Sequence, residues 1–176
     1  PSADSPPALL VFDAQAFIFG PSGERVMPLE QFFVGSKKTA LHLAEILTRI
    51  VLPEPQPGLG SAFLKVGRVA ADVATVNAAV SLKREDGRIR SCRIALGSVT
   101  PRPIRSRRVE EALEGQPYSP DLVEHASTLA SMEVQPSKRA RIGRSTAEYR
   151  KAAIKSLVRD AIQKAWERAS EKGRKR

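Results

Sequence analysis

Apolar and polar positions alternate along several short segments of this chain, and glycine or proline bounds most of them. Residues 9–12 form a short apolar run that predicts a helix or a strand. In residues 14–19, Ala14, Ala16 and Ile18 alternate with Gln15, Phe17 and Phe19, which predicts a strand. The Gly-Pro-Ser-Gly turn at 20–23 predicts a hairpin with residues 25–29. Residues 44–52 are rich in branched apolar side chains and end at a proline, so they predict a further strand.

Proline and glycine are concentrated in residues 53–60, where they fill five of eight positions. Such a segment sustains neither a helix nor a ladder, so a domain boundary is predicted there. Beyond it, extended patterns occupy residues 61–66, 73–84 and 88–99, the last two joined by an Asp-Gly turn. We expect an antiparallel sheet of about three strands, with one face packed and the other wetter.

Helical patterns follow this sheet. Residues 106–114 predict a short helix, and Ser119 is the predicted N-cap of a second helix that runs to residue 132. The spacing of Ser145 and Glu148 is that of a capping box, which predicts the start of the longest helix, over 147–170. The order of elements predicts an α+β fold.

The net charge of +10 comes entirely from the C-terminal quarter of the 176 residues, because residues 136–176 carry 14 basic and four acidic side chains. A basic end can bind nucleic acid, form a solvated helix face or dock on an acidic partner. The segment holds only two aromatic residues and no recognisable nucleic-acid motif. We therefore expect no nucleic acid, and a docking role for Arg150, Lys151 and Lys155 is a hypothesis that rests on charge alone.

Few residues are suited to metal or disulfide chemistry. Cys92 is the single cysteine, so a disulfide within the chain and a cysteine-built cluster are excluded, and its simplest interpretation is a buried core residue. His42 and His125 lie too far apart in sequence for a metal-ligand pattern, and His42 is expected at the surface.

The longest apolar run is far shorter than a membrane span needs, and the single cysteine favours a reducing, cytoplasmic location. The sequence begins with Pro1 rather than Met, so we do not expect Pro1 to be the translation start.

Four charged residues have simple structural interpretations. Asp4 is placed to cap a following helix, and Lys65 lies within an apolar strand, where it must reach the surface or face a polar ligand. Arg68 and Asp72 are spaced for a local ion pair.

Several segments, in a consistent order, together resemble the flavin-binding medium subunit of the molybdenum hydroxylases, the family of xanthine dehydrogenase and carbon monoxide dehydrogenase. The segments that carry the resemblance are Pro1-Ser2-Ala3-Asp4 with Pro7-Ala8-Leu9-Leu10, Phe32-Phe33-Val34-Gly35 with Lys38-Thr39, Glu45-Ile46-Leu47, Phe63-Leu64-Lys65 with Arg68 and Ala71-Asp72-Val73-Ala74, Arg93-Ile94-Ala95-Leu96-Gly97, Leu113-Glu114-Gly115 and Ala147-Glu148-Tyr149-Arg150.

The resemblance implies the domain organisation. Residues 1–56 correspond to the C-terminal part of a PCMH-type FAD-binding α/β domain, and residues 57–60 form a linker. Residues 61–168 correspond to a domain of three-stranded antiparallel sheet with a helical bundle, as in the C-terminal domain of the CO dehydrogenase flavoprotein, and residues 169–176 form a basic tail. The family's Gly-rich pyrophosphate-binding segments have no counterpart here, so FAD binding is expected to need a further, upstream half of the FAD domain.

The resemblance also implies a site and a function. Asp4, Leu47 and Lys65 match cofactor-binding positions of the family, and Ser2 is a weaker match; no catalytic residue and no metal ligand are implied. The implied function is electron transfer, from iron–sulfur clusters on a small subunit through FAD to an external acceptor. The molybdenum cofactor that oxidises the substrate is expected on a large subunit, and the 2Fe-2S clusters on the small one. The alternative is an assembly module of such a complex that does not bind flavin by itself.

Overall fold

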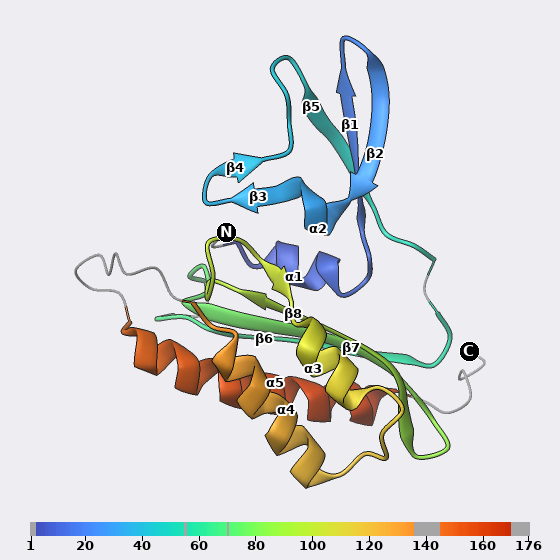
Figure 1. Cartoon of the computed structure of the whole chain (residues 1–176), viewed down its shortest axis with the longest axis vertical. Helices are drawn as coiled ribbons and strands as arrows, with labels where there is room; N and C mark the ends of the chain where they lie inside the picture. Colours follow the sequence, from blue (N-terminus) through green and yellow to red (C-terminus); the bar gives the residue numbers. More distant parts are fainter. Residues whose placement is uncertain (1–2, 55, 70, 136–144, 170–176) are drawn as a thin grey trace.

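The computed structural model describes residues 3–54, 56–69, 71–135 and 145–169. We refer to residues 3–54 as the N-terminal module and to the remaining described residues as the C-terminal module (Figure 1). The N-terminal module contains α1 (Ser5–Leu10), β1 (Gln15–Gly20), β2 (Gly23–Pro28), α2 (Leu29–Phe32), β3 (Phe33–Gly35), β4 (Lys38–Thr39) and β5 (Ile46–Val51). The C-terminal module contains β6 (Leu59–Val66), β7 (Val76–Glu85), β8 (Arg88–Gly97), β9 (Ile104–Arg105), α3 (Arg107–Leu113), α4 (Pro120–Met132) and α5 (Ala147–Arg168).

The N-terminal module is built on an antiparallel sheet with the strand order β2-β1-β5. The predicted hairpin of β1 and β2 is confirmed, with Phe17 opposite Val26 in the register. The pairing of β1 with β5 shifts after Phe17, and Thr48 Oγ1 donates a hydrogen bond of 3.0 Å to the Phe17 carbonyl at this irregularity. A separate small hairpin pairs β3 with β4.

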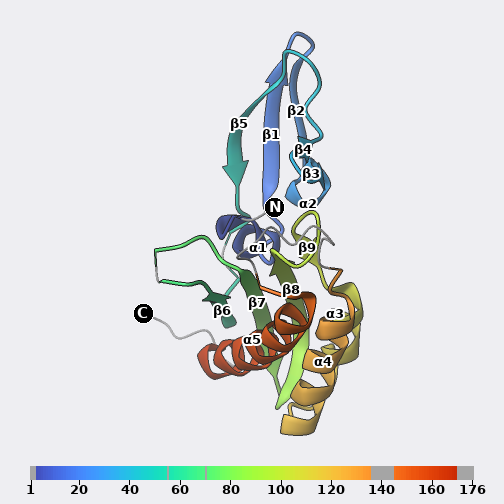
Figure 2. The same ribbon diagram turned by 90° about the vertical axis from the view of Figure 1, so that its left-hand side faces the viewer.

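The C-terminal module is built on an antiparallel sheet with the order β6-β7-β8-β9. Its three long strands are those that the sequence predicts, and the two-residue strand β9 adds a fourth at one edge. The strand β6 begins at Leu59, which lies inside the predicted linker 57–60. Helices α3, α4 and α5 cover one face of this sheet, and α1 lies across the other (Figures 1 and 2).

The expectation that one face of this sheet is wet is wrong. In β7, Val76, Ala78, Val80 and Leu82 face the helical layer, and the alternate side chains Asn77, Ala79 and Ser81 are equally buried. The cause is α1, which covers these small side chains; the Val11 carbonyl, just after α1, accepts a hydrogen bond of 2.7 Å from Ser81 Oγ. A second hydrophobic cluster, which includes Leu10, Ile18, Leu29 and Ala79, therefore joins the two modules.

Of the caps predicted for the two longest helices, α4 and α5, one is correct. Ser119 caps α4, because its side chain accepts a hydrogen bond from the Leu122 N–H. The cap of α5 is Thr146, whose side chain accepts from the Tyr149 N–H at 3.2 Å, so the predicted capping box at Ser145 lies one residue too early. The predicted basic tail, from residue 170 onward, lies outside the described residues.

Candidate functional site

Asp4 and Lys65 form an ion pair that joins the start of α1 to the end of β6. Lys65 Nζ donates a hydrogen bond of 2.7 Å to Asp4 Oδ2 and one of 2.9 Å to the carbonyl oxygen of Asp72. The other carboxylate oxygen, Asp4 Oδ1, accepts a 3.0 Å hydrogen bond from the Ala74 N–H. The two side chains are 31% and 28% exposed, so the pair lies at the surface with one side open.

The local structure explains why these residues meet. The alternation of β6 directs Lys65 to the face of the sheet that α1 covers, and the register places it opposite Asn77 of β7. Asp4 holds the N-cap position of α1, yet its side chain makes no capping hydrogen bond. The interpretation of Asp4 as a helix cap is therefore wrong. Lys65 reaches the surface, as one of its two interpretations required, and its ammonium is held there by Asp4 and the Asp72 carbonyl.

Electrostatics keep Asp4 ionised. Partial burial opposes ionisation of the carboxyl, but the hydrogen bonds from Lys65 and from the Ala74 N–H, with the positive charge of Lys65, outweigh it and lower the pKa of Asp4. An ammonium has three N–H donors, and Asp4 and Asp72 use two of those of Lys65. Within the described part of the chain the third donor has no partner, so it can bind an electron-rich ligand atom.

Sequence reasoning missed Asn77, which lies beneath this pair. Its side chain is fully buried, and its Nδ2 lies 3.5 Å from both Asp4 Oδ1 and the Ala3 carbonyl. Among the described residues its Oδ1 has no hydrogen-bond partner, and it faces Gly97, where any Cβ would overlap it. An amide among the apolar residues of the first half of β7 was the signal that could have identified this residue.

The third predicted cofactor residue, Leu47, lies on the other module. It is in β5, opposite Ile18 of β1, and its half-buried side chain packs against the second hydrophobic cluster. The structure thus joins Asp4 to Lys65 directly, whereas Leu47 belongs to a different sheet (Figure 1). Ser2 lies outside the described residues.

A second charged network lies at the far end of α1. Asp13, which follows α1 with a positive φ of 52°, pairs with Arg93 at 2.6 Å and with Arg105 at 2.8 Å. Arg105 also binds Glu110 through two hydrogen bonds of 2.5 and 2.8 Å, and Glu110 accepts another from the Ile94 N–H. Arg105 and Glu110 are almost fully buried, so this network joins the modules by buried charge.

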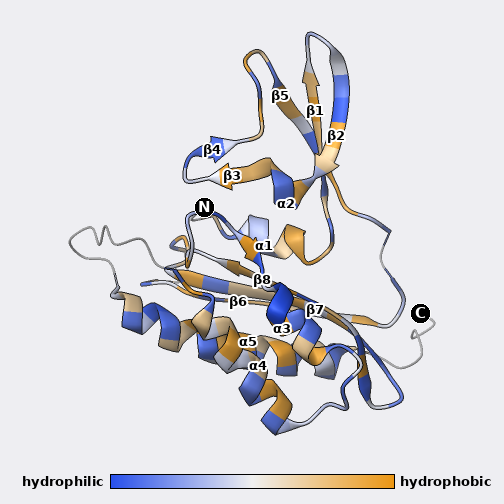
Figure 3. Ribbon diagram, viewed as in Figure 1, coloured by the Kyte–Doolittle hydropathy of each residue, from blue (hydrophilic) through white to orange (hydrophobic). Residues whose placement is uncertain are grey.

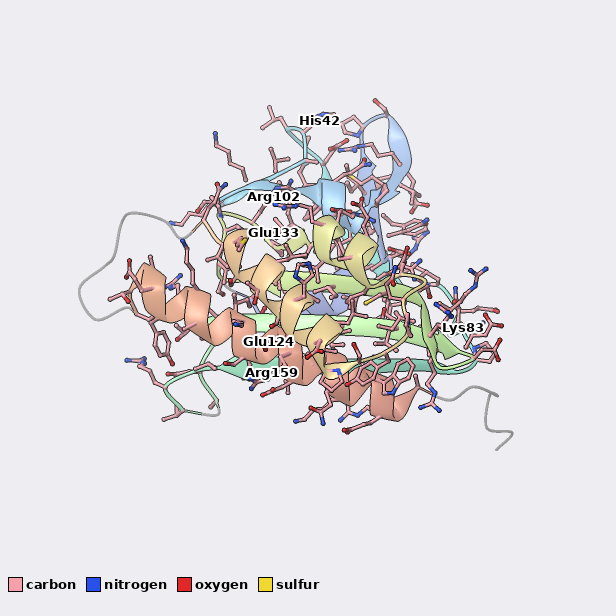
Figure 4. All side chains as sticks on the ribbon, turned by 60° about the horizontal axis from the view of Figure 1, so that its bottom comes forward. His42, Lys83, Arg102, Glu124, Glu133 and Arg159 are labelled. Atoms are coloured by element: carbon pink, nitrogen blue, oxygen red, sulfur yellow. The ribbon has the colours of Figure 1, made fainter. Side chains whose placement is uncertain are left out.

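The loop and helix around β9 reinforce this connection. Arg107 pairs with Glu30 of α2 at 2.7 Å, and Arg102, labelled in Figure 4, lies 3.5 Å from the carbonyl oxygens of Glu30 and Phe33. Three arginines from residues 102–107 therefore reach the N-terminal module.

The predicted docking residues of α5 are partly engaged within the chain. Arg150 donates to the Ser98 carbonyl at 2.8 Å, and Lys155 pairs with Glu124 of α4 at 2.6 Å (Figure 4 labels Glu124). Lys151 is exposed. Charge reversal at Arg150 or Lys155 would thus disturb the fold as well as any docking surface.

The predictions for Cys92, for His42 and for the Arg68–Asp72 pair are confirmed. Cys92 is buried, and burial raises the pKa of its thiol far above the usual range. The His42 side chain is 78% exposed, and Arg68 pairs with Asp72 at 3.1 Å.

Among the described residues, no three His, Cys, Asp or Glu side chains gather as a metal site would require. None of the helices described is long and apolar enough to cross a membrane.

Comparison with protein families gives two matches that divide the chain. Residues 61–165 match the CO dehydrogenase flavoprotein C-terminal domain, and residues 1–55 match the FAD binding domain in molybdopterin dehydrogenase.

Individual relatives agree with these matches. The carbon monoxide dehydrogenase medium chain of Hydrogenophaga pseudoflava is 29% identical over 170 residues, which are 97% of this chain and 58% of that protein. The xanthine dehydrogenase FAD-binding subunit of Escherichia coli O157:H7 is 30% identical over 166 residues, 93% of this chain and 56% of that protein. The chain thus spans little more than half the length of these curated relatives.

Solved structures show the same fold. A carbon monoxide dehydrogenase from Hydrogenophaga pseudoflava that lacks the Mo-pyranopterin moiety matches with a TM-score of 0.91 and 31% identity, over 97% of this chain and 58% of that one. Quinoline 2-oxidoreductase from Pseudomonas putida 86 matches with a TM-score of 0.84 and 29% identity, over 94% and 56% of the two chains.

Proposed function

This chain belongs to the family of the CO dehydrogenase flavoprotein C-terminal domain, and on this premise we propose that it is the C-terminal portion of an FAD-binding electron-transfer subunit. The complex that contains it would be a molybdenum-containing hydroxylase or dehydrogenase. In that complex, electrons from the substrate cross iron–sulfur clusters and pass by way of FAD to an external acceptor.

The single observation that carries this proposal is the half-exposed Lys65–Asp4 pair. FAD, when bound, supplies reversible uptake of reducing equivalents. Asp4 holds the Lys65 ammonium in place, and nothing in the described part of the chain accepts the third N–H of Lys65, which can therefore bind a ligand. A fixed positive charge at this point favours electron density on an adjacent acceptor atom. Leu47 would add an apolar contact from the N-terminal module.

The partners follow from the same premise. The relatives' names describe a medium chain and an FAD-binding subunit. We infer an iron–sulfur small subunit, a molybdenum-bearing large subunit and an upstream half of the FAD domain as partners of this chain, in the cytoplasm. An assembly module without flavin is less well supported. It gives no role to Lys65, whose third N–H donor has no acceptor among the described residues and lies at the open side of the ion pair.

Substitution of Lys65 in the assembled complex tests the proposal. We expect Lys65→Met to lower the two-electron midpoint potential of the flavin by about 30–60 mV, since a loss of roughly 1.4 kcal/mol corresponds to 30 mV. Lys83→Met is the matched control. Lys83 lies on the same face of the sheet as Lys65, but near the end of β7 that is remote from Asn77, the residue opposite Lys65. A complex without flavin, or a potential that is unchanged in Lys65→Met, would contradict the proposal.

A further inference from the structure

Asn77 is the only amide side chain in β7, and it is fully buried. In the buried part of the strand its neighbours are apolar apart from Ser81, and Figure 3 shows hydrophobic colouring along much of this sheet. Burial of an amide costs free energy unless its hydrogen-bonding groups are paired. Packing alone therefore does not explain why this position holds an amide.

The orientation of the Asn77 amide is set by two oxygen atoms on one side of it. Its Nδ2 lies 3.5 Å from Asp4 Oδ1 and 3.5 Å from the Ala3 carbonyl oxygen. The reverse orientation would place Oδ1 against two acceptors, so the amide turns its donors toward them. In consequence Oδ1 points at Gly97, and no group in the described part of the chain donates to it. A buried oxygen without a donor is rare in a native protein, so the contact with Asp4 and Ala3 is made at a cost.

Packing against β8 and α1 keeps the amide from turning away. Gly97 lies opposite Asn77 in the register of β7 with β8. A Cβ at Gly97 would overlap Asn77 Oδ1 and would lie 2.7 Å from Pro7 Cγ of α1. The amide fits only because Gly97 has no side chain, and its position is fixed by this close contact.

The contacts of Asp4 divide between its two carboxylate oxygens. Oδ1 faces the Asn77 amide and accepts the Ala74 N–H at 3.0 Å, whereas Oδ2 accepts from Lys65 Nζ at 2.7 Å. Asn77 and Lys65 are cross-strand partners in the register of β6 with β7, so their side chains leave the sheet side by side. We propose that Asn77 is a positioning residue of the Asp4–Lys65 pair: its amide holds Oδ1, so that Oδ2 is directed at the Lys65 ammonium. The inference rests on the proposed function and adds to it the residue that fixes the charged pair for the cofactor.

The competing interpretation is that Asn77 only fastens α1 to the sheet, and Ser81 provides the comparison. Ser81 lies four positions further along β7, on the same face, and is equally buried. Its Oγ donates a hydrogen bond of 2.7 Å to the Val11 carbonyl, just after α1. Ser81→Ala therefore removes a buried hydrogen bond between β7 and this helical segment without touching the Asp4–Lys65 pair, and it is the matched control.

Hydrogen exchange of the Lys65 ammonium reports on the pair directly and needs neither flavin nor a partner chain. A bound donor exchanges its protons when it leaves its acceptors. The full chain is labelled with 15N-lysine, the NMR signal that disappears in Lys65→Met is assigned to Lys65, and its exchange rate is measured. Asn77→Leu removes the donors but keeps a γ-branched side chain in the same space. Asn77→Ala removes them with a side chain too short to reach Gly97.

We expect the Lys65 ammonium to exchange at least about threefold faster in both Asn77 variants, since loss of one hydrogen bond has an effect of this order. In Ser81→Ala we expect a change of less than about twofold. Native exchange in both Asn77 variants, or equal acceleration in Ser81→Ala, would overturn the proposal. Native exchange in Asn77→Leu with acceleration in Asn77→Ala would also overturn it, because Asn77 would then act by filling space.

Flavin retention by the assembled complex tests what this positioning contributes. We expect Asn77→Leu to weaken flavin binding at least about threefold, and Ser81→Ala to change it less than about twofold. Unchanged retention in Asn77→Leu would overturn the link between Asn77 and the cofactor. A native complex that never contains flavin would instead contradict the proposed function, whereas faster ammonium exchange, which is measured without flavin, would still support the positioning of Asp4 by Asn77.

Discussion

Asp4 and Asp13 lie at opposite ends of α1, and each pairs with cations from the same face of the C-terminal sheet. Asp4 contacts Lys65 at 2.7 Å, and Asp13 contacts Arg93 at 2.6 Å and Arg105 at 2.8 Å. Between these pairs the two central strands, β7 and β8, present the small side chains of Ala79, Ser81 and Ala95, so the helix lies close to them. The short helix is thereby fixed at both ends, and Asp4 has little freedom to move along the sheet.

This arrangement fixes the position of the Lys65 ammonium. A lysine on an edge strand ordinarily samples many rotamers, and ordering it costs up to about 2 kcal/mol. Here Asp4 and the Asp72 carbonyl hold Nζ in one place. A site organised in this way needs little rearrangement when a ligand arrives.

Removing the charge of Asp4 should release this lysine. We expect Asp4→Asn to lower the free energy of unfolding by about 1–2 kcal/mol, because a charge-assisted hydrogen bond is lost. We also expect it to reduce flavin retention by the assembled complex. Urea unfolding measures the first effect and flavin absorbance the second. Asp72→Asn is the control, since Asp72 contacts Lys65 only through its main-chain carbonyl; flavin retention that fell equally in both variants would contradict this role of Asp4.

The charged network at the C-terminal end of α1 is predicted to contribute more to stability than the Asp4–Lys65 pair at its N-terminal end. Arg105→Met would leave Glu110, whose side chain is only 6% exposed, without its principal counter-ion, so we expect a loss of about 3–5 kcal/mol. Arg93→Met removes a pair whose side chains are 30% and 47% exposed, and should cost less than about 1 kcal/mol. Chemical denaturation of both variants measures the difference, and similar losses would show that burial does not set the strength of this network.

The long strands could be predicted from the sequence, whereas the contacts of α1 could not. The alternation in 73–84 and 88–99 and the Asp-Gly turn between them predicted the β7–β8 hairpin, because period-two patterning and turn chemistry are local properties. The burial of Asn77 and Ser81 depends on a helix some 70 positions away in sequence, which periodicity does not reveal.

The candidate site shows the same division. Lys65 stood out as a charge in an apolar strand, but only the resemblance paired it with Asp4 and Leu47. The role of Asp13 was missed, since an aspartate after a short helix has the pattern of an ordinary loop residue. Its positive φ and its two arginines, one of them buried, are properties of the folded chain alone.

Low pH should weaken the contacts of Glu45, in the loop before β5, over a defined pH range. The hydrogen bonds from Arg25 and from the His42 N–H lower the pKa of Glu45 to about 2, from 4.5 in the absence of these contacts. Because the folded pKa is the lower one, this stabilisation is complete above about pH 5 and is lost as the pH falls toward 2. The difference in unfolding free energy between the native chain and Glu45→Gln, measured against pH, should therefore shrink over this range. A difference that stays constant would show that Glu45 does not titrate with folding.

The start of α5 distinguishes the observed cap from the predicted one. Thr146 accepts the hydrogen bond of the Tyr149 N–H, whereas Ser145 Oγ accepts one from Arg150 Nε. We expect Thr146→Ala to cost about 1 kcal/mol, as loss of an N-cap usually does. Ser145→Ala removes only a side-chain contact at the same helix end and should cost less than about 0.5 kcal/mol. Thermal or urea unfolding of the two variants decides between the positions, since a capping box at Ser145 would require the larger loss in Ser145→Ala.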